Sequence, residues 1–574
     1  MSLRLSAAFA VIAFASSASA QTPAQKVDAV ADRFVAETLN YNPSASYSTG
    51  LKAPTHARYY DNSEAAIRAF EAKLDAIEAD ARAIDAKALN PQQAITLAVL
   101  IDGLESDRGT RVCKSHLWNL NHMFGWQSYL VRTALEQPVG DADLRAQALQ
   151  RAGSIPKFAA TETANLRKGL TEGYAAPKPV VARVIKQIDG MISADPLKSP
   201  LYSPASRDKD AAFGAALAKV ITDQINPALK QYRDFLQTEY MPKARDTLGL
   251  SALPNGAACY QAQLRGYTTL DRTPKQVFDL GSATVAANAE IVKGLGQKLY
   301  GTQDLKEIAK RTTEAPANKL GSEDEFITYT RQIVDSSRVA SAALVTKLPD
   351  QDMVVKPFEP FMRGSGVSSH YEMSADPKKP GTYRIASEKW ASETKGGAEI
   401  TAVHEGWPGH HLQIAMALGV KRHDLFKVAF NSAYVEGWAR YSEALSEEVG
   451  IYTNDYPKIS RRMWPARGMV LDPGIHIFGW TREQAAAYAQ ESGRFQGDEA
   501  DDLVDRIAVL PGQLTAYDSG GLEIFALRKQ AEEALGAKFD LKAFHDAVLK
   551  NGVVPLKVLR SEVEAWIASE KTRS

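Results

Sequence analysis

An octapeptide at residues 404–411, His-Glu-Gly-Trp-Pro-Gly-His-His, constrains the fold more than any other stretch of this 574-residue chain. It contains three of the ten histidines in the sequence. Pro408 lacks a backbone N–H and its ring would collide with the preceding turn, while Gly406 and Gly409 tolerate unusual backbone dihedrals. We therefore expect the helix that carries His404 and Glu405 to be kinked or bulged, by about two residues, before the last two histidines.

The residue types of this segment are typical of a hydrolytic zinc site, which uses three protein ligands and leaves one position open for water. His404, Glu436 and either His410 or His411 can supply these ligands. With the extra residues looped out, His410 returns to the place of the second histidine in a His-Glu-x-x-His helix. His411 lies on the same face as His404 in an unbroken helix, but about 10 Å further along the axis. We favour His410, because that separation strains a shared metal.

Glu405 has a separate role in this hypothesis. Its carboxylate can take the proton from the metal-bound water and return it to the leaving amine. A structural metal site needs no such base, so Glu405 favours an enzyme. Two simpler interpretations compete: Glu436 as a surface carboxylate paired with Arg440 one turn later, and a di-iron bundle. The second requires Glu-x-x-His pairs, and no histidine of the chain has a glutamate three residues before it.

The octapeptide resembles the His-Glu-x-x-Pro-Gly-His-His signature of a large bacterial family of uncharacterised, mostly secreted proteins. That family is similar to the helical zincins, which include angiotensin-converting enzyme, oligopeptidases and thermostable carboxypeptidases. The resemblance extends over most of residues 360–560 and rests on these further segments: Gly381–Tyr383, Glu436–Ala439, Asp472–His476, Gly479–Gln484, Pro511–Gln513 with Tyr517, and Phe544–Leu549.

The resemblance implies a mainly α, zincin-like fold with a deep cleft and a short β-hairpin or edge strand near the metal helix. It implies that residues 381–386, with Tyr383, form an unpaired strand edge that binds an extended peptide. It also implies that His476 and Tyr517 face the metal and donate hydrogen bonds to the developing oxyanion. A packing hairpin, a buried histidine and a core tyrosine are the alternatives for these three features.

The charge of the chain bears on its partners, and its amino-terminal segment indicates its compartment. Lys and Arg number 68, as do Asp and Glu, which gives no indication of a nucleic acid or an anionic membrane as partner. Residues 1–20 have the short basic start, the apolar run and the Ala-Ser-Ala end of a signal peptide. We expect cleavage after Ala20, a periplasmic location and no membrane anchor, since the segment is short and the residue directly after the cleavage site is Gln21 and not a cysteine that could be lipidated. A secreted protein of a Gram-positive organism is the alternative.

The only two cysteines are Cys113 and Cys259. In an oxidising compartment such a pair predicts a disulfide, and two buried free thiols are the alternative. The bridge would close a long loop and stabilise the amino-terminal half by roughly 4–5 kcal/mol in the chain-entropy model.

Hydrophobic periodicity predicts helices over much of the chain. Ile67, Phe70, Leu74 and Ile77 recur at alternating spacings of three and four residues in a helix expected over 63–88, ended by Asn90-Pro91. Similar patterns cover 141–152, 206–237, 275–297, 323–346, 425–449 and 523–536, whereas the Pro-rich segments near 174–179, 195–204 and 349–360 predict loops. Thr481 and Gln484 form a candidate capping box.

Together these features predict three segments and one activity. Residues 1–20 are the signal peptide, 21–360 an amino-terminal helical half that forms one cleft wall, and 361–574 the half that binds the metal. We expect an exported zinc metallopeptidase that hydrolyses small peptides, with Zn²⁺ held by His404, His410 and Glu436. The alternatives are a periplasmic peptide-binding or scaffold protein with a structural metal, and a hydrolase of another amide or ester. The oligomeric state and the choice between exo- and endo-cleavage are left open.

Overall fold

The computed structural model is mainly helical, with 70% of its residues in helices and 3% in strands. It describes residues 22–359, 363, 368–374, 376, 378–429, 431–495 and 497–573. The expected signal peptide lies outside these residues. The mainly α class predicted from the periodicity is therefore confirmed.

Twelve α-helices precede residue 270 in the part of the chain that the structure describes. They are α1 (Pro23–Tyr41), α2 (Ala45–Thr49), α3 (Glu64–Arg82), α4 (Pro91–Thr110), α5 (Trp126–Glu136), α6 (Ala142–Gly153), α7 (Ile155–Thr171), α8 (Lys178–Met191), α9 (Ser203–Ser206), α10 (Ala211–Val220), α11 (Asn226–Phe235) and α12 (Gly256–Thr268). Asn90 does not end a helix. It caps the start of α4 by accepting the N–H of Gln93, and Pro91 occupies the first helical position, where a missing N–H is harmless.

Fourteen more α-helices follow among the described residues. They are α13 (Pro274–Tyr300), α14 (Leu305–Glu314), α15 (Glu323–Ser341), α16 (Lys395–Glu405), α17 (His410–Leu418), α18 (Leu425–Val428), α19 (Ser432–Glu448), α20 (Tyr456–Met463), α21 (Arg467–His476), α22 (Arg482–Gln490), α23 (Asp498–Val509), α24 (Ala516–Leu535), α25 (Leu541–Leu549) and α26 (Leu556–Thr572). The capping box predicted at Thr481 and Gln484 is present at the start of α22.

The described strands form one small sheet in the order β1-β3-β2. β1 (Met353–Pro357) pairs parallel with β3 (Gly381–Ile385), and β2 (His370–Glu372) pairs antiparallel with the other side of β3. The strand predicted at 381–386 therefore exists, but the expectation that it offers an unpaired edge is wrong. Both of its edges are taken, and Tyr383 is only 1% exposed.

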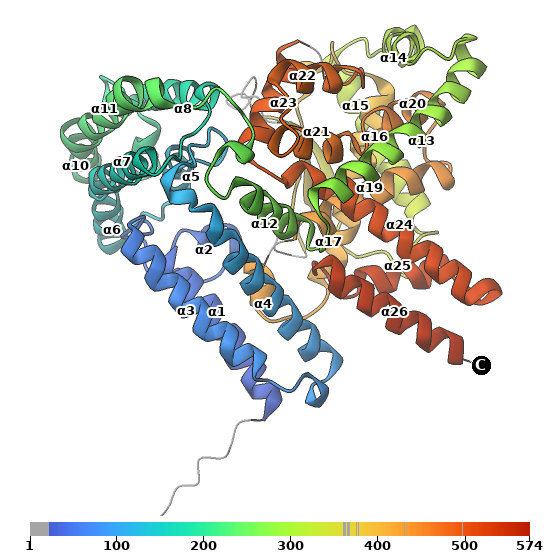
Figure 1. Cartoon of the computed structure of the whole chain (residues 1–574), viewed down its shortest axis with the longest axis horizontal. Helices are drawn as coiled ribbons and strands as arrows, with labels where there is room; N and C mark the ends of the chain where they lie inside the picture. The colour runs from blue at the N-terminus through green and yellow to red at the C-terminus, as the bar shows by residue number, and fades with distance from the viewer. Residues whose placement is uncertain are drawn as a thin grey trace, which may run out of the picture.

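The helices pack around two main hydrophobic cores and extend to opposite ends of the molecule (Figure 1). Helices α6–α11 lie at one end of the molecule, and α13, α14 and α20 lie at the other. The largest core joins α1, α3 and α4 to the sheet and to α17, α19 and α24–α26. A second core joins α5–α8 and α10–α11 to α21–α23. Both cores contain residues from either side of residue 360, so the amino-terminal half packs directly against the half that carries the octapeptide.

A disulfide joins Cys113 to Cys259, as predicted from the sequence. Both half-cystines are buried, and the bridge ties the segment after α4 to α12. It belongs to the amino-terminal part of the chain and not to the octapeptide.

Helices α19 and α24 cross at glycines, which sets the position of the residues beside the octapeptide. A Cβ atom at Gly437 would lie 2.5 Å from the Cα atom of Gly520, and one at Gly520 would lie 1.8 Å from the carbonyl oxygen of Ala433. No side chain fits at either position. The crossing brings the start of α24, with Tyr517 and Asp518, against the middle of α19.

Among the described residues, no helix combines the length and the apolar character that crossing a membrane requires.

Candidate metal centre

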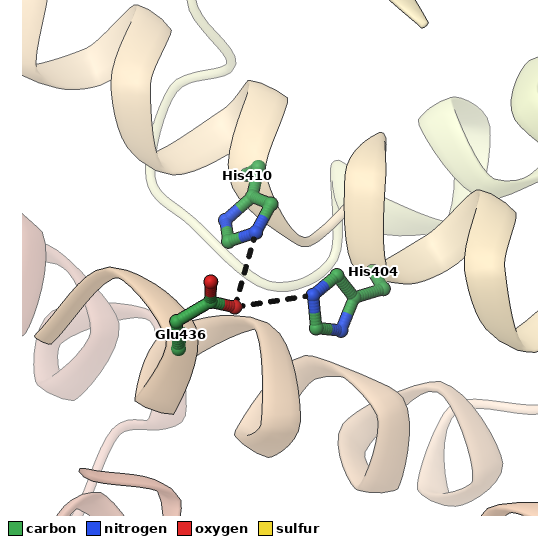
Figure 2. Close-up of side chains that lie close together, drawn as sticks. All are labelled: His404, His410 and Glu436. Atoms are coloured by element: carbon green, nitrogen blue, oxygen red, sulfur yellow. Dashed lines mark ion pairs between the residues drawn. The ribbon is translucent and has the colours of Figure 1, made fainter. Parts of the chain in front are cut away.

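Three side chains from three helices converge on one point (Figure 2). His404 comes from α16, His410 from α17 and Glu436 from α19. The Oε2 atom of Glu436 lies 3.5 Å from Nε2 of His404 and 3.6 Å from Nε2 of His410. The three candidate ligand atoms all lie within 4.8 Å of one another.

These separations suit a shared metal ion better than direct hydrogen bonds. Ligand atoms placed tetrahedrally at about 2.1 Å from zinc are roughly 3.4 Å apart, close to the two separations at Glu436. A hydrogen bond would bring the atoms to within about 3.2 Å. Oε2 of Glu436 is also buried without a hydrogen-bond partner. The residues present therefore fit a zinc ion bound by two imidazoles and one carboxylate.

A complete break between α16 and α17 places His410 at this point. The sequence predicted a kink or bulge, whereas in the structure α16 ends at Glu405 and α17 begins at His410. The N–H of Gly409 bonds to the carbonyl of Val403, and a Cβ atom at Gly409 would lie 2.0 Å from the carbonyl oxygen of His404. Only glycine fits at position 409, in the segment between the two helices.

Helix α19 holds the break in place. The indole N–H of Trp438 donates to the carbonyl of Pro408 at 2.8 Å, and the hydroxyl of Ser442 donates to the same oxygen at 3.2 Å. The helix that provides Glu436 thus also fixes the segment between the two histidines.

A second carboxylate orients His404. Oε1 of Glu443 lies 2.8 Å from Nδ1 of His404, and the guanidinium of Arg440 donates to both oxygens of Glu443 at 2.8 and 3.1 Å. With Nδ1 engaged, Nε2 of His404 is directed at Glu436. Carboxylate–imidazole pairs of this kind fix the orientation and raise the basicity of metal-binding histidines. The competing interpretation, in which Arg440 pairs with Glu436, is wrong, because Arg440 pairs with Glu443. The Nε atom of Arg440 also lies 3.6 Å from Oδ1 of Asp518.

The electrostatics of the cluster show how strongly these groups interact. Burial alone would lower the pKa of His404, but the carboxylates of Glu436 and Glu443 raise that pKa to about 10. Burial would raise the pKa of Glu436, and the two facing histidines instead lower it. In the same way Arg440 and His404 overcome burial and lower the pKa of Glu443 to about 2. The point between the three side chains therefore attracts positive charge.

Glu405 lies beside the first candidate ligand and is held by the sheet. Its Oε2 atom accepts the backbone N–H of Tyr371 in β2 at 2.9 Å. Tyr371 lies opposite Tyr383 of β3, but its backbone N–H points away from β3, towards Glu405. The bond fixes the carboxylate next to His404.

His411 points elsewhere and takes no part in the cluster. Its Nδ1 atom lies 2.9 Å from the hydroxyl of Tyr371, and its Nε2 atom lies 3.1 Å from the carbonyl oxygen of Gln351. Burial lowers its pKa to about 4, so the ring is neutral. One ring nitrogen thus links α17 to β2, and the other links it to the segment before β1.

Tyr517 lies next to the cluster. Its ring packs under the guanidinium of Arg440 at 5.6 Å, and its hydroxyl lies 3.2 Å from Nη2 of Arg506. Burial raises the pKa of Tyr517, and the charge of Glu436 adds to this effect, so the phenol stays protonated near neutral pH.

His476 is not brought to the cluster. The N–H of Leu250 donates to its Nδ1 atom at 3.2 Å, and its Nε2 atom lies 3.0 Å from the carbonyl oxygen of Ile507. Burial lowers its pKa to about 3, and its ring stacks on Tyr260. The structure gives His476 a role in joining distant segments and leaves it no free donor.

Two residues at the site were not predicted from the sequence. Glu443 follows Glu436 by seven residues on the same helix, so the helical period could have indicated that both carboxylates share a face. Tyr371 supports Glu405 through its backbone and His411 through its hydroxyl. No sequence pattern marks it, because the pairing of β2 with β3 brings it there.

Solved structures with the same fold cover almost the whole chain. "The putative lipoprotein from Colwellia psychrerythraea" matches with a TM-score of 0.84 at 22% identity, over 96% of this chain and 100% of that one. "A putative lipoprotein of unknown function from Shewanella oneidensis" matches with a TM-score of 0.77 at 21% identity, over 94% of this chain and 99% of that one. At these identities the likeness shows the fold alone. No curated protein matches the chain.

A family model described as a bacterial protein of unknown function matches residues 43–563. This range contains the octapeptide, Glu436, Glu443 and Tyr517, and most of the helices around them. The chain belongs to this bacterial family, DUF885.

Proposed function

We propose that this protein is an exported zinc-dependent peptidase that hydrolyses small peptides, with a helical, zincin-like arrangement around its metal centre. The observation that carries the proposal is the convergence of His404, His410 and Glu436 next to a carboxylate that is not part of the cluster. A structural site would need the ligands but not Glu405.

Zinc bound at this point would polarise the substrate carbonyl and lower the pKa of the attacking water. Glu405 would accept the proton of that water and pass it to the leaving amine. The amide of Tyr371 holds Glu405 in place for this transfer, and Tyr517 would donate a hydrogen bond to the oxygen that becomes negative.

Peptide would bind along β2 and not along β3. β2 is an outer strand of the described sheet. The outward N–H of Tyr371 is taken by Glu405, so a peptide beside β2 would pair through the outward carbonyl of Tyr371. An extended chain beside β2 would therefore run past the metal centre. Pairing through the backbone makes few demands on sequence, which agrees with a substrate class of short and varied peptides.

Export is supported by three observations. The first 20 residues have the pattern of a signal peptide, a disulfide joins the only two cysteines, and two proteins of the same fold are called putative lipoproteins. We place the protein in the periplasm.

The experiment that tests the proposal compares three proteins loaded with zinc: wild type, Glu405→Gln, and the control Glu448→Gln, which changes an exposed carboxylate on α19. Each is incubated with a mixed peptide library, and new chain ends are identified by mass spectrometry. We expect cleavage by wild type and control, and a loss of about 10²- to 10⁴-fold in Glu405→Gln with zinc content unchanged. Absence of cleavage by folded, zinc-loaded wild type would refute the proposal, as would full activity of Glu405→Gln.

A further inference from the structure

A pocket lies beside the metal centre. Two of its lining residues, Arg440 and Tyr517, also lie next to the candidate ligands and Glu443. Its lining includes Arg440, Tyr517 and Asp518, together with Arg494 and Arg506. Trp464 is among the apolar side chains of its wall. The pocket encloses about 90 Å³, several times the roughly 10–15 Å³ that one water requires.

The charged side chains of the pocket are predominantly basic. Three arginines face one aspartate. Arg440 is neutralised by Glu443 and has Asp518 nearby. The carboxylates of Glu393 and Glu443 act on Arg494 in the same way, which leaves the positive charge of Arg506.

Arg506 is the best-defined of these cations. Its Nη2 atom donates to the side-chain oxygen of Gln513 at 2.8 Å and to the hydroxyl of Tyr517 at 3.2 Å. Both partners are neutral, and no carboxylate of the described residues lies within 4 Å of this guanidinium. Its Nε atom is also buried and has no hydrogen-bond partner among the described residues. A partly buried guanidinium with unused donors favours an anion beside it, since an unpaired charge away from water is costly.

We propose that this arginine pocket binds the carboxylate at the C-terminus of a peptide substrate, so that the enzyme removes short fragments from the carboxyl end. The inference rests on the proposed peptidase function. The planar, forked donors of arginine match a carboxylate in two parallel hydrogen bonds.

The position of the pocket relative to the metal centre supports this assignment. Arg440 follows Glu436 by one helical turn, about 6 Å along the axis of α19. An extended residue spans about 3.3–3.6 Å, so a carboxylate held beside Arg440 and Arg506 would lie a small number of residues beyond the bond at the metal. The pocket would therefore fix the length of the released fragment.

Binding is measured first, so that the outcome does not depend on turnover. The probe is one peptide without acidic side chains, prepared with a free C-terminal carboxylate and with a C-terminal amide. Both forms are titrated calorimetrically into zinc-loaded Glu405→Gln protein. We expect the free acid to bind about 10- to 100-fold more tightly than the amide. A third peptide, amidated but ending in aspartate, separates the C-terminal carboxylate from an acidic side chain and should bind as weakly as the amide.

Substitution of Arg506 then locates the effect. In Glu405→Gln/Arg506→Gln the preference for the free acid should fall to within about twofold, while affinity for the amide stays unchanged. Arg506→Lys should retain part of the preference, because it keeps the charge but loses the fork. Arg183→Gln is the matched control, since Arg183 pairs with Asp502 and Asp505 of the same helix α23 but does not line the pocket. It should leave the preference intact.

Cleavage distinguishes this inference from the proposed function. Wild type should release a fragment of fixed short length from the free acid and act about 10- to 100-fold more slowly on the amide. Cleavage of both forms at equal rates would leave the peptidase proposal intact and overturn the carboxylate pocket. Equal binding of acid and amide, tight binding of the amidated aspartate peptide, or a preference that survives in Arg506→Gln would overturn it as well. An acid preference lost in Arg506→Gln, without any turnover by wild type, would support the pocket and refute only the peptidase.

Discussion

Glu443 lies 2.8 Å from Nδ1 of His404, on the side of the imidazole ring opposite Glu436. The two carboxylates are seven residues apart on α19 and face opposite nitrogens of one imidazole ring. One helix thus provides a candidate ligand, the group that orients another ligand, and the contacts that hold the break at Pro408.

The first prediction concerns this orienting carboxylate. Replacing Glu443 by Gln should weaken zinc binding about 10- to 100-fold, because the neutral amide raises the basicity of His404 less than a carboxylate does. Competition with a chelating dye measures the affinity, and Glu448→Gln on the same helix is the control. The variant also leaves Arg440 without its main partner, so its melting temperature must be measured alongside. Unchanged zinc affinity in a folded Glu443→Gln protein would show that Glu443 serves Arg440 and not the metal centre.

The second prediction concerns the phenol of Tyr517. Tyr517→Phe should lower kcat about 10²- to 10³-fold with little change in KM, because a donor to the oxyanion is used mainly in the transition state. Steady-state kinetics on a single peptide separates the two constants. A rise confined to KM would assign the hydroxyl to the arginine pocket through its contact with Arg506. Unchanged kinetics would remove Tyr517 from both roles.

The third prediction concerns the disulfide. The Cys113→Ser/Cys259→Ser variant should lose roughly 2–5 kcal/mol of unfolding free energy, because the bridge no longer restricts a loop of more than a hundred residues in the unfolded chain. Denaturant unfolding measures the loss. Its zinc content should match that of wild type, since the bridge ties α12 to the segment after α4, whereas the candidate ligands lie on α16, α17 and α19. A variant as stable as wild type would contradict the expected contribution, and loss of zinc would show coupling between the two sites.

Local chemistry explains which parts of the site could be predicted from the sequence. Pro408 disrupts a helix, and Gly406 and Gly409 tolerate the dihedrals of an interrupted one, so an interruption could be predicted here that brings His410 back towards His404. The capping box of Thr481 and the pairing of two lone cysteines are likewise set by residue type and short spacing, or by the absence of any other partner.

Features that depend on distant segments could not be predicted in this way. β3 is a middle strand because β1 pairs with it from a segment whose proline content predicted a loop. Nothing near Tyr383 indicates that second partner. His476 resembles a donor by its order in the chain, but Leu250 and Ile507 occupy both of its nitrogens from elements far away in sequence. The basic pocket arises in the same way, where α19, α23 and α24 meet.

The most direct test of the account is the zinc content of the mature chain and of two single variants, measured by elemental analysis after dialysis. We predict about one zinc per chain in wild type and in His411→Gln, and a loss of nearly all zinc in His410→Ala, because only His410 faces Glu436 and His404. The melting temperature of each protein excludes unfolding as the cause. Zinc retained in folded His410→Ala but lost in His411→Gln would contradict the ligand assignment, and wild type without affinity for zinc would contradict the metal centre itself.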